Sequence, residues 1–169
     1  MSALKMDGKV IAERIRKEIA GKVAKLSSPI GLGTILVGSD PGSVAYVDGK
    51  HKDCAEVGIK SIKVNLLDSV STADVVAAVN KLNQDPNCTG FIVQLPLPSG
   101  IDVQEVLSAI DPKKDADGLT PTNLGNLVLS FNEIIPCTPK AIVALLSDCL
   151  LYTSPSPRDL STSRMPSSA

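Results

Sequence analysis

The sequence predicts an α/β fold in which a mostly parallel sheet carries helices on both of its faces. Segments with helical periodicity alternate with short apolar runs along most of the chain, which is the pattern of successive strand and helix units. Such alternation favours a parallel sheet that helices cover on both sides. At 169 residues the chain is long enough for one complete core and part of a second domain.

The first elements follow from periodicity and turn residues. Apolar residues recur at helical spacing from Val10 to Leu26, which predicts an amphipathic helix. The run G-L-G-T-I-L-V at 31–37 predicts a buried strand that ends in the turn signals G-S-D-P-G-S. A second helix is predicted over 43–57, because Gly58 is a typical C-terminal stop, and the following residues 59–66 alternate as a strand.

The next elements carry clearer local signals. Ser71 and Asp74 fit a capping box, which predicts the start of a third helix. Residues 89–95 form the most strand-like run of the chain, and the two prolines of the P-L-P segment that follows end this strand. Ligands of parallel sheets gather at the carboxyl ends of the strands, so the loops after the three predicted strands are the candidate site.

Composition and charge exclude several classes of protein. Lys and Arg number 17 against 18 Asp and Glu, which argues against binding to nucleic acid, and the two Tyr and two Phe are too few for stacking on bases. No apolar run is long enough to span a membrane. The four cysteines form no C-x-x-C pair and His51 is the single histidine, so we expect no metal site and a reducing, cytoplasmic location without a targeting signal.

Five polar residues are candidates for chemistry, and each has a structural alternative. Tyr46 and Lys50 form a Y-x-x-x-K pair on one helix face, where the lysine could shuttle a proton or could simply be solvated. Gln94 ends an apolar strand, so its amide either faces a cleft or bonds to the next loop. Asp115 and Asp117 could hold an amide-bearing ligand edge, although a solvated turn is the better interpretation from the residues alone.

The glycines of the first strand could be mistaken for a dinucleotide-binding fingerprint. That fingerprint places its glycines after a strand and at the start of a helix, whereas Gly31 and Gly33 are predicted to begin a strand. We therefore reject a phosphate-binding loop at this position.

Four motifs together resemble one family. The run Y-V-D-G-K-H-K-D-C-A-E-V-G-I from Tyr46, G-F-I-V-Q-L-P-L-P from Gly90, K-D-A-D-G-L from Lys114 and P-C-T-P from Pro136 are similar, in order and approximate spacing, to the signatures of methylenetetrahydrofolate dehydrogenase/methenyltetrahydrofolate cyclohydrolases. The resemblance extends from Met6 to about Cys149.

The resemblance implies a two-step reaction and a set of site residues. Members of the family oxidise 5,10-methylenetetrahydrofolate with NADP, or in some cases NAD, and hydrolyse the methenyl product to 10-formyltetrahydrofolate. By resemblance, Lys50 assists proton transfer, Tyr46 stacks against the folate, Gln94 bonds to Lys50, and Asp117 binds the pterin. Leu95 and Pro96 would complete the substrate-binding set.

The resemblance also implies a division of the chain. Residues 1–135 would form the folate-binding catalytic domain, and 136–149 would begin the helix that leads to a Rossmann cofactor domain. No glycine phosphate loop follows in this sequence, so we expect the cofactor-binding residues to be missing and this chain to be unable to perform the dehydrogenase step. Residues 150–169 are rich in Ser, Thr and Pro, which predicts a disordered tail. This tail resembles translated adaptor or vector sequence, so we expect it to be non-native.

Two alternatives stay open at this point. The Y-x-x-x-K pair also occurs in short-chain dehydrogenases, which would use Tyr46 and Lys50 but need a glycine-rich turn after a first strand. The other alternative is a non-catalytic folate-binding module. The intact parent enzyme is expected to be a homodimer that binds tetrahydrofolate derivatives, without nucleic acid or membrane partners.

Overall fold

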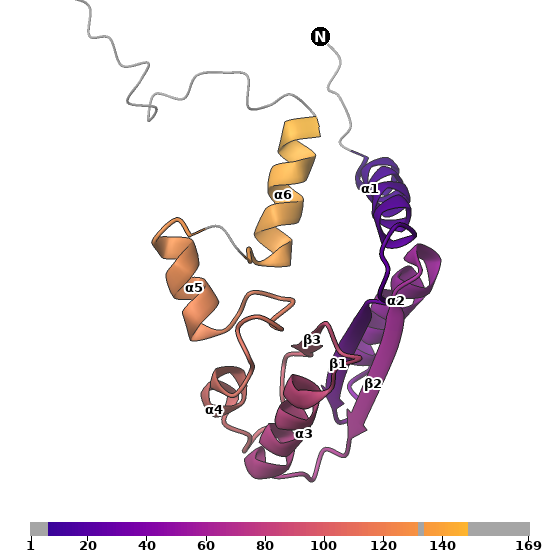
Figure 1. The fold of residues 1–169 in the computed structure, drawn as a ribbon. Helices are drawn as coiled ribbons and strands as arrows, with labels where there is room; N and C mark the ends of the chain where they lie inside the picture. The colour runs from indigo at the N-terminus through magenta and orange to yellow at the C-terminus, as the bar shows by residue number, and fades with distance from the viewer. Residues whose placement is uncertain (1–6, 132–133, 149–169) are drawn as a thin grey trace, which may run out of the picture.

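The computed structural model describes residues 7–131 and 134–148, which form an α/β fold (Figure 1). In chain order the elements are α1 (Gly8–Val23), β1 (Gly31–Val37), α2 (Pro41–Val57), β2 (Lys60–Leu66), α3 (Thr72–Gln84), β3 (Gly90–Val93), α4 (Val103–Ser108), α5 (Pro121–Val128) and α6 (Cys137–Asp148). The predicted tail at 150–169 lies outside the described residues.

The sheet is parallel, with the strand order β2-β1-β3. Central strand β1 begins with the two glycines, as predicted, because both are needed for close packing: a Cβ at Gly33 would lie 2.7 Å from the Cβ of Phe91. Strand β3 is shorter than the predicted run 89–95. It pairs with β1 only as far as Val93, and the chain then passes through a cis peptide bond between Leu95 and Pro96.

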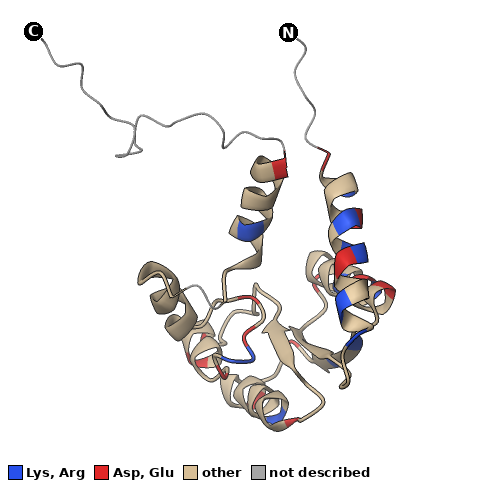
Figure 2. Cartoon of the chain, turned by 45° about the horizontal axis from the view of Figure 1, so that its top comes forward, with Lys and Arg blue, Asp and Glu red and all other residues tan. Residues whose placement is uncertain are grey.

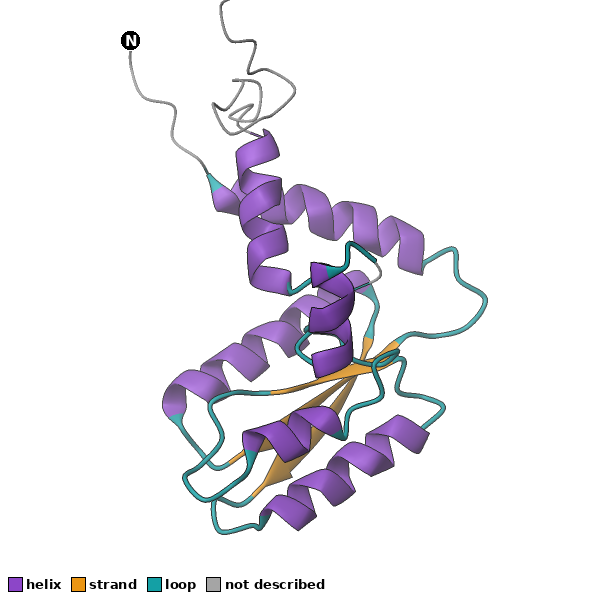
Figure 3. Ribbon diagram, turned by 90° about the vertical axis from the view of Figure 1, so that its left-hand side faces the viewer, coloured by secondary structure: helices purple, strands orange, loops and turns teal. Residues whose placement is uncertain are grey.

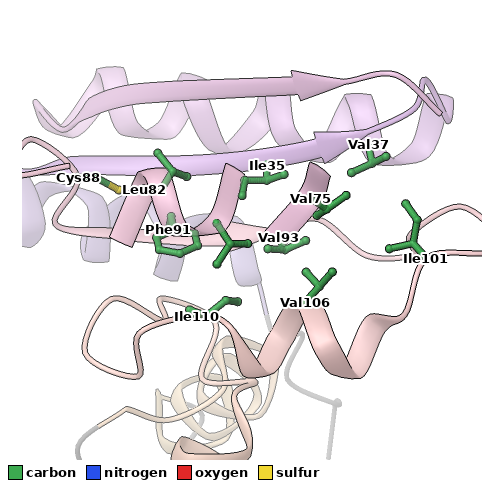
Figure 4. Packing of buried hydrophobic residues seen from close by; sticks show 11 residues of the cluster. Ile35, Val37, Val75, Leu82, Cys88, Phe91, Val93, Ile101, Val106 and Ile110 are labelled. Carbon is green, nitrogen blue, oxygen red and sulfur yellow. The ribbon is translucent and has the colours of Figure 1, made fainter. Parts of the chain in front are cut away.

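Helices cover both faces of the sheet, which confirms the predicted fold class. Helix α2 lies behind the sheet in Figure 1 and α3 in front of it. The main core lies between β1, β3, α3 and α4, and Figure 4 shows how its apolar side chains interlock. Phe91 and Ile35 of the sheet, together with Val75 and Val79 of α3 and Val106 of α4, are completely buried there. Burial of such side chains is the main stabilising contribution to the fold.

Local signals set the helix boundaries. Gly58 caps α2 in the left-handed conformation, with φ of 81°, and Ser71 and Asp74 form the predicted capping box of α3. Helix α2 begins two residues earlier than predicted, because Asp40 caps it through the backbone N–H of Ser43 and Pro41 fits the first turn.

A short segment extends the sheet beyond β3. Phe91 donates its backbone N–H to the carbonyl of Lys114 at 2.8 Å, and Ala116 donates back to the carbonyl of Phe91 at 3.1 Å. This parallel bridge pairs Phe91 with Asp115. It fixes the loop that contains Asp117 beside β3.

Helices α1 and α6 project away from the sheet on the same side (Figure 3). Arg14 of α1 and Asp148 of α6 form an ion pair between them, and Arg16 of α1 pairs with Asp53 and Glu56 of α2. Figure 2 shows charged residues concentrated on α1, whereas α5 carries none. Within the described residues, no helix is long and apolar enough to cross a membrane.

Candidate active site at the carboxyl edge of the sheet

Lys50 and Gln94 meet at the carboxyl edge of the sheet. Gln94 directly follows β3, and its backbone N–H still bonds to the carbonyl of Ile35 at 2.9 Å. The Lys50 ammonium donates to Gln94 Oε1 over 3.4 Å, and Gln94 Nε2 donates to the carbonyl of Leu95. Because only the amide nitrogen can donate to that carbonyl, the Leu95 contact turns the amide oxygen of Gln94 toward Lys50. The predicted contact between these two residues is therefore present.

Tyr46 lies one helical turn before Lys50 on α2, and its side chain extends into solvent. The residue is 69% exposed, although most large aromatic side chains are buried. It lines two cavities. One, of about 330 Å³, is also lined by Gln94, Leu95 and Pro96, and the other, of about 460 Å³, is also lined by Lys50. The Tyr46 ring therefore borders both cavities and is accessible for stacking on a planar ligand.

Asp117 reaches the same region through the bridge of 114–116 to β3. Asp117 lies two residues after this bridge, and its charge acts on the Cys137 thiol, as the charge of Lys50 also does. Asp117 is half-buried, and it lies close enough to Cys137, the first residue of α6, to act on its thiol.

Cys137 lies near both Lys50 and Asp117, a position that we did not expect from the sequence. Its Sγ donates to the carbonyl of Ala116 at 3.6 Å. Partial burial of the thiol and the negative charge of Asp117 raise the pKa of Cys137, whereas the positive charge of Lys50 lowers it. The thiol therefore lies within electrostatic reach of both Asp117 and Lys50. Its position in the P-C-T-P motif was the only sequence signal for it.

Asp115 belongs to the framework of the site, and the expected solvated turn is wrong for this residue. It is only 2% exposed, and its carboxylate accepts hydrogen bonds from the backbone N–H groups of Gly118 and Thr120 and from the amide of Asn123, at 2.8–2.9 Å. Burial alone would raise the pKa of Asp115, but these hydrogen bonds lower it below its usual value. Asp115 thus holds the loop that presents Asp117.

His51 attaches α2, the helix that carries Lys50, to the sheet. Its Nε2 lies 2.8 Å from Oγ1 of Thr34, a fully buried residue in the middle of β1, and its Nδ1 is buried without a hydrogen-bond partner. Burial, and next the positive charge of Lys63, lower the pKa of His51, so the ring is neutral near neutral pH. This contact holds α2 against the central strand one residue from Lys50.

A further cavity of about 350 Å³ lies at the opposite, amino edge of the strands. Its lining includes Gly31, Ile59, Gly90 and Ile134 but none of the predicted site residues Tyr46, Lys50, Gln94 and Asp117. Lys50 and Gln94 meet at the carboxyl edge of the sheet, so we place the candidate site there.

The turn between β1 and α2 is not suited to bind the phosphate of a dinucleotide. The β1–α2 turn is the place where a phosphate would meet a helix N-terminus, but the carboxylate of Asp40 already accepts the Ser43 N–H there. Hydrogen bonds from Ser43 lower the pKa of Asp40, so its negative charge would repel a phosphate. No cluster of three potential metal ligands is present among the described residues either.

Comparisons with known proteins identify the family and the fold of this chain. Residues 6–117 match the family model "Tetrahydrofolate dehydrogenase/cyclohydrolase, catalytic domain". The fold is similar to the bifunctional methylenetetrahydrofolate dehydrogenase/cyclohydrolase of Campylobacter jejuni, with 37% identity and a TM-score of 0.83 over 86% of this chain and 53% of that one. It is also similar to the Trypanosoma brucei enzyme solved with NADP and an inhibitor, with 37% identity and a TM-score of 0.83 over 88% and 53% of the two chains.

A 5,10-methylenetetrahydrofolate dehydrogenase from Bombyx mori matches equally well, with 33% identity and a TM-score of 0.84 over 89% of this chain and 53% of that one. The chain thus spans about half the length of these solved structures. The matches decide against the short-chain dehydrogenase alternative. By its sequence and by its fold, this chain belongs to the tetrahydrofolate dehydrogenase/cyclohydrolase family, of which it contains the catalytic domain.

Proposed function

We propose that this chain binds tetrahydrofolate derivatives at the carboxyl edge of its sheet and provides the proton-transfer group of a methenyltetrahydrofolate cyclohydrolase. The observation that carries the proposal is the contact between Lys50 and Gln94 beside the exposed ring of Tyr46. These are the residue types that the family resemblance assigns to the reaction, and they lie at the strand ends where ligands of parallel sheets bind.

Each residue has a distinct task in this proposal. Tyr46 stacks on the flat part of the folate, and Leu95 and Pro96 line the hollow beside it. Asp117 accepts hydrogen bonds from the amino and ring N–H groups of the pterin. Lys50 assists the proton transfers that accompany the addition of water to the methenyl carbon. Gln94 holds the Lys50 side chain at the reacting position.

The oxidation step belongs to the whole parent enzyme in this proposal. NADP accepts the hydride there, which the NADP complex of the Trypanosoma brucei structure supports. No step through NADP is assigned to the residues of this chain. We propose domain limits of 1–135 and 136–149, as the motifs imply. That the parent is a cytoplasmic homodimer rests on the family resemblance alone.

The hydrolysis of 5,10-methenyltetrahydrofolate tests this proposal. The purified chain should accelerate the loss of the methenyl absorbance above the spontaneous rate, and Lys50→Met should abolish the acceleration while the variant stays folded. A matched control is Lys52→Met, because Lys52 lies exposed on the same helix outside both cavities. If the chain binds folate but Lys50→Met hydrolyses as fast as the unmodified chain, the catalytic role is wrong and a binding module remains.

A further inference from the structure

Thr34 and His51 form a buried polar contact between β1 and α2. Thr34 is completely buried in the middle of β1, and His51 lies on the buried face of α2 between Val47 and Cys54. The Nε2 atom of His51 lies 2.8 Å from Oγ1 of Thr34, so the two groups share a hydrogen bond. The Nδ1 atom of the same ring is buried without a partner. Because a buried polar atom without a partner costs stability, stability alone does not explain this pair.

The hydrogen bond gives the contact between α2 and the sheet a direction. Apolar packing alone is non-directional, so it would allow α2 to rotate or slide slightly on β1. A hydrogen bond accepts only a narrow range of distances and angles, and it therefore fixes both the position and the rotation of the helix. The ion pair between Lys63 and Asp48 also joins α2 to the sheet, but both side chains are largely exposed and such pairs contribute little.

The position of Lys50 depends on this placement, because Lys50 directly precedes His51 on the helix. Its ammonium reaches Gln94 Oε1 over 3.4 Å, which is close to the longest distance of a hydrogen bond. Side chains reach about 5–6 Å from a helix axis, so a rotation of α2 by about 10° moves them by about 1 Å. A displacement of that size breaks the contact with Gln94, and misplacement of a reacting group by about 1 Å can slow a reaction about 100-fold.

We infer that His51 is a positioning residue for Lys50, because its hydrogen bond to Thr34 fixes the rotation of α2 at which the Lys50 ammonium meets Gln94. This inference rests on the proposed function, and it adds a residue that lines neither cavity of the candidate site. Loss of the contact should slow the proton transfer. Stacking on the exposed ring of Tyr46 depends on many weak contacts, so it should tolerate a small shift of the helix.

The test is the hydrolysis of 5,10-methenyltetrahydrofolate by the full chain with both partners replaced, in the double variant His51→Leu/Thr34→Val. This variant leaves no unpaired polar group behind, so its thermal midpoint should stay within about 4 °C of that of the unmodified chain. Its kcat should fall about tenfold or more, and its KM should change by less than about twofold. The single variant His51→Gln should retain most of the kcat, because its amide can bond to Thr34 as the ring does.

Cys54→Ala is the matched control for a general loosening of α2. Cys54 lies on the same buried face of the helix, three residues after His51. The substitution removes packing without removing the hydrogen bond to Thr34. The thermal midpoint of Cys54→Ala should therefore fall, whereas its kcat should equal that of the unmodified chain.

The outcomes separate this inference from the proposed function. If the unmodified chain accelerates the hydrolysis and the double variant is equally fast, the inference is wrong and the proposed function stands. The same conclusion follows if Cys54→Ala loses as much kcat as the double variant, because the effect would then come from packing. If the unmodified chain does not accelerate the hydrolysis at all, the proposed function is wrong and the inference fails with it.

Discussion

Asp115→Asn should destabilise the fold strongly, although it only replaces one carboxylate oxygen with an NH₂ group. The carboxylate offers Oδ1 to the N–H of Gly118 and Oδ2 to the N–H of Thr120 and the amide of Asn123. Asparagine has one oxygen, so its NH₂ group must face at least one of these donors in a site that is 2% exposed. A hydrogen bond to a charged group contributes about 1.5–3 kcal/mol, and the remaining bonds become neutral, so the expected loss is about 3 kcal/mol.

Urea unfolding measures this effect. With a denaturant slope of about 1–3 kcal/mol per molar urea, a loss of about 3 kcal/mol lowers the midpoint by about 1–3 M. Asp48→Asn is the control, because Asp48 is an exposed partner of Lys63 and such pairs contribute at most about 1 kcal/mol. If the free energy of unfolding of Asp115→Asn lies within about 0.5 kcal/mol of that of the unmodified chain, the three hydrogen bonds do not support this loop and the reasoning is refuted.

The pH dependence gives a second check on Asp115. Its pKa in the folded state is below the unfolded value, so its stabilisation is complete above about pH 4 and is lost as the pH falls through the lower folded value. The stability of Asp115→Asn should therefore fall less steeply in acid than that of the unmodified chain. An equally steep acid loss in both proteins would show that Asp115 is not the group responsible.

Two further predictions concern groups around Lys50. The pKa of His51 is lowered in the folded state, so the unfolded chain binds more protons below about pH 6.5 and the free energy of unfolding should decrease there. When unfolding is measured between about pH 7 and pH 5, the contribution of His51 to this decrease should be absent in His51→Leu. Asp117 raises the pKa of Cys137, so Asp117→Asn should lower that pKa and speed the alkylation of Cys137 by iodoacetamide at about pH 8, measured in a Cys149→Ser background. An unchanged rate would show that Asp117 does not act on the Cys137 thiol.

The parts of the site that local sequence governs could be predicted. The helical period places Tyr46 and Lys50 on one face of α2, and the strand end at Gln94 places its amide at the carboxyl edge. Both positions follow from residues within one element. The parallel sheet and its two-sided helix cover follow in the same way from the alternation of elements.

The remaining parts depend on contacts between distant segments. Asp117 enters the site through a single bridge between Asp115 and Phe91, in a loop that has no strand pattern of its own. The buried role of Asp115 likewise depends on donors that the chain supplies after the turn. The His51 contact joins α2 to Thr34, and neither residue carries a sequence signal for the other. Only the folded chain shows that these side chains meet.

Binding of 5-formyltetrahydrofolate by titration calorimetry tests the central claim most directly, with the unmodified chain, Lys50→Ala and Asp117→Ala measured in parallel. If the carboxyl edge of the sheet is a folate site, the unmodified chain binds, and both substitutions weaken binding about tenfold or more without lowering the thermal midpoint. The removal of a charge-assisted contact, at about 1.5–3 kcal/mol, supports that magnitude. Equal affinity in all three proteins would contradict the assignment of the site.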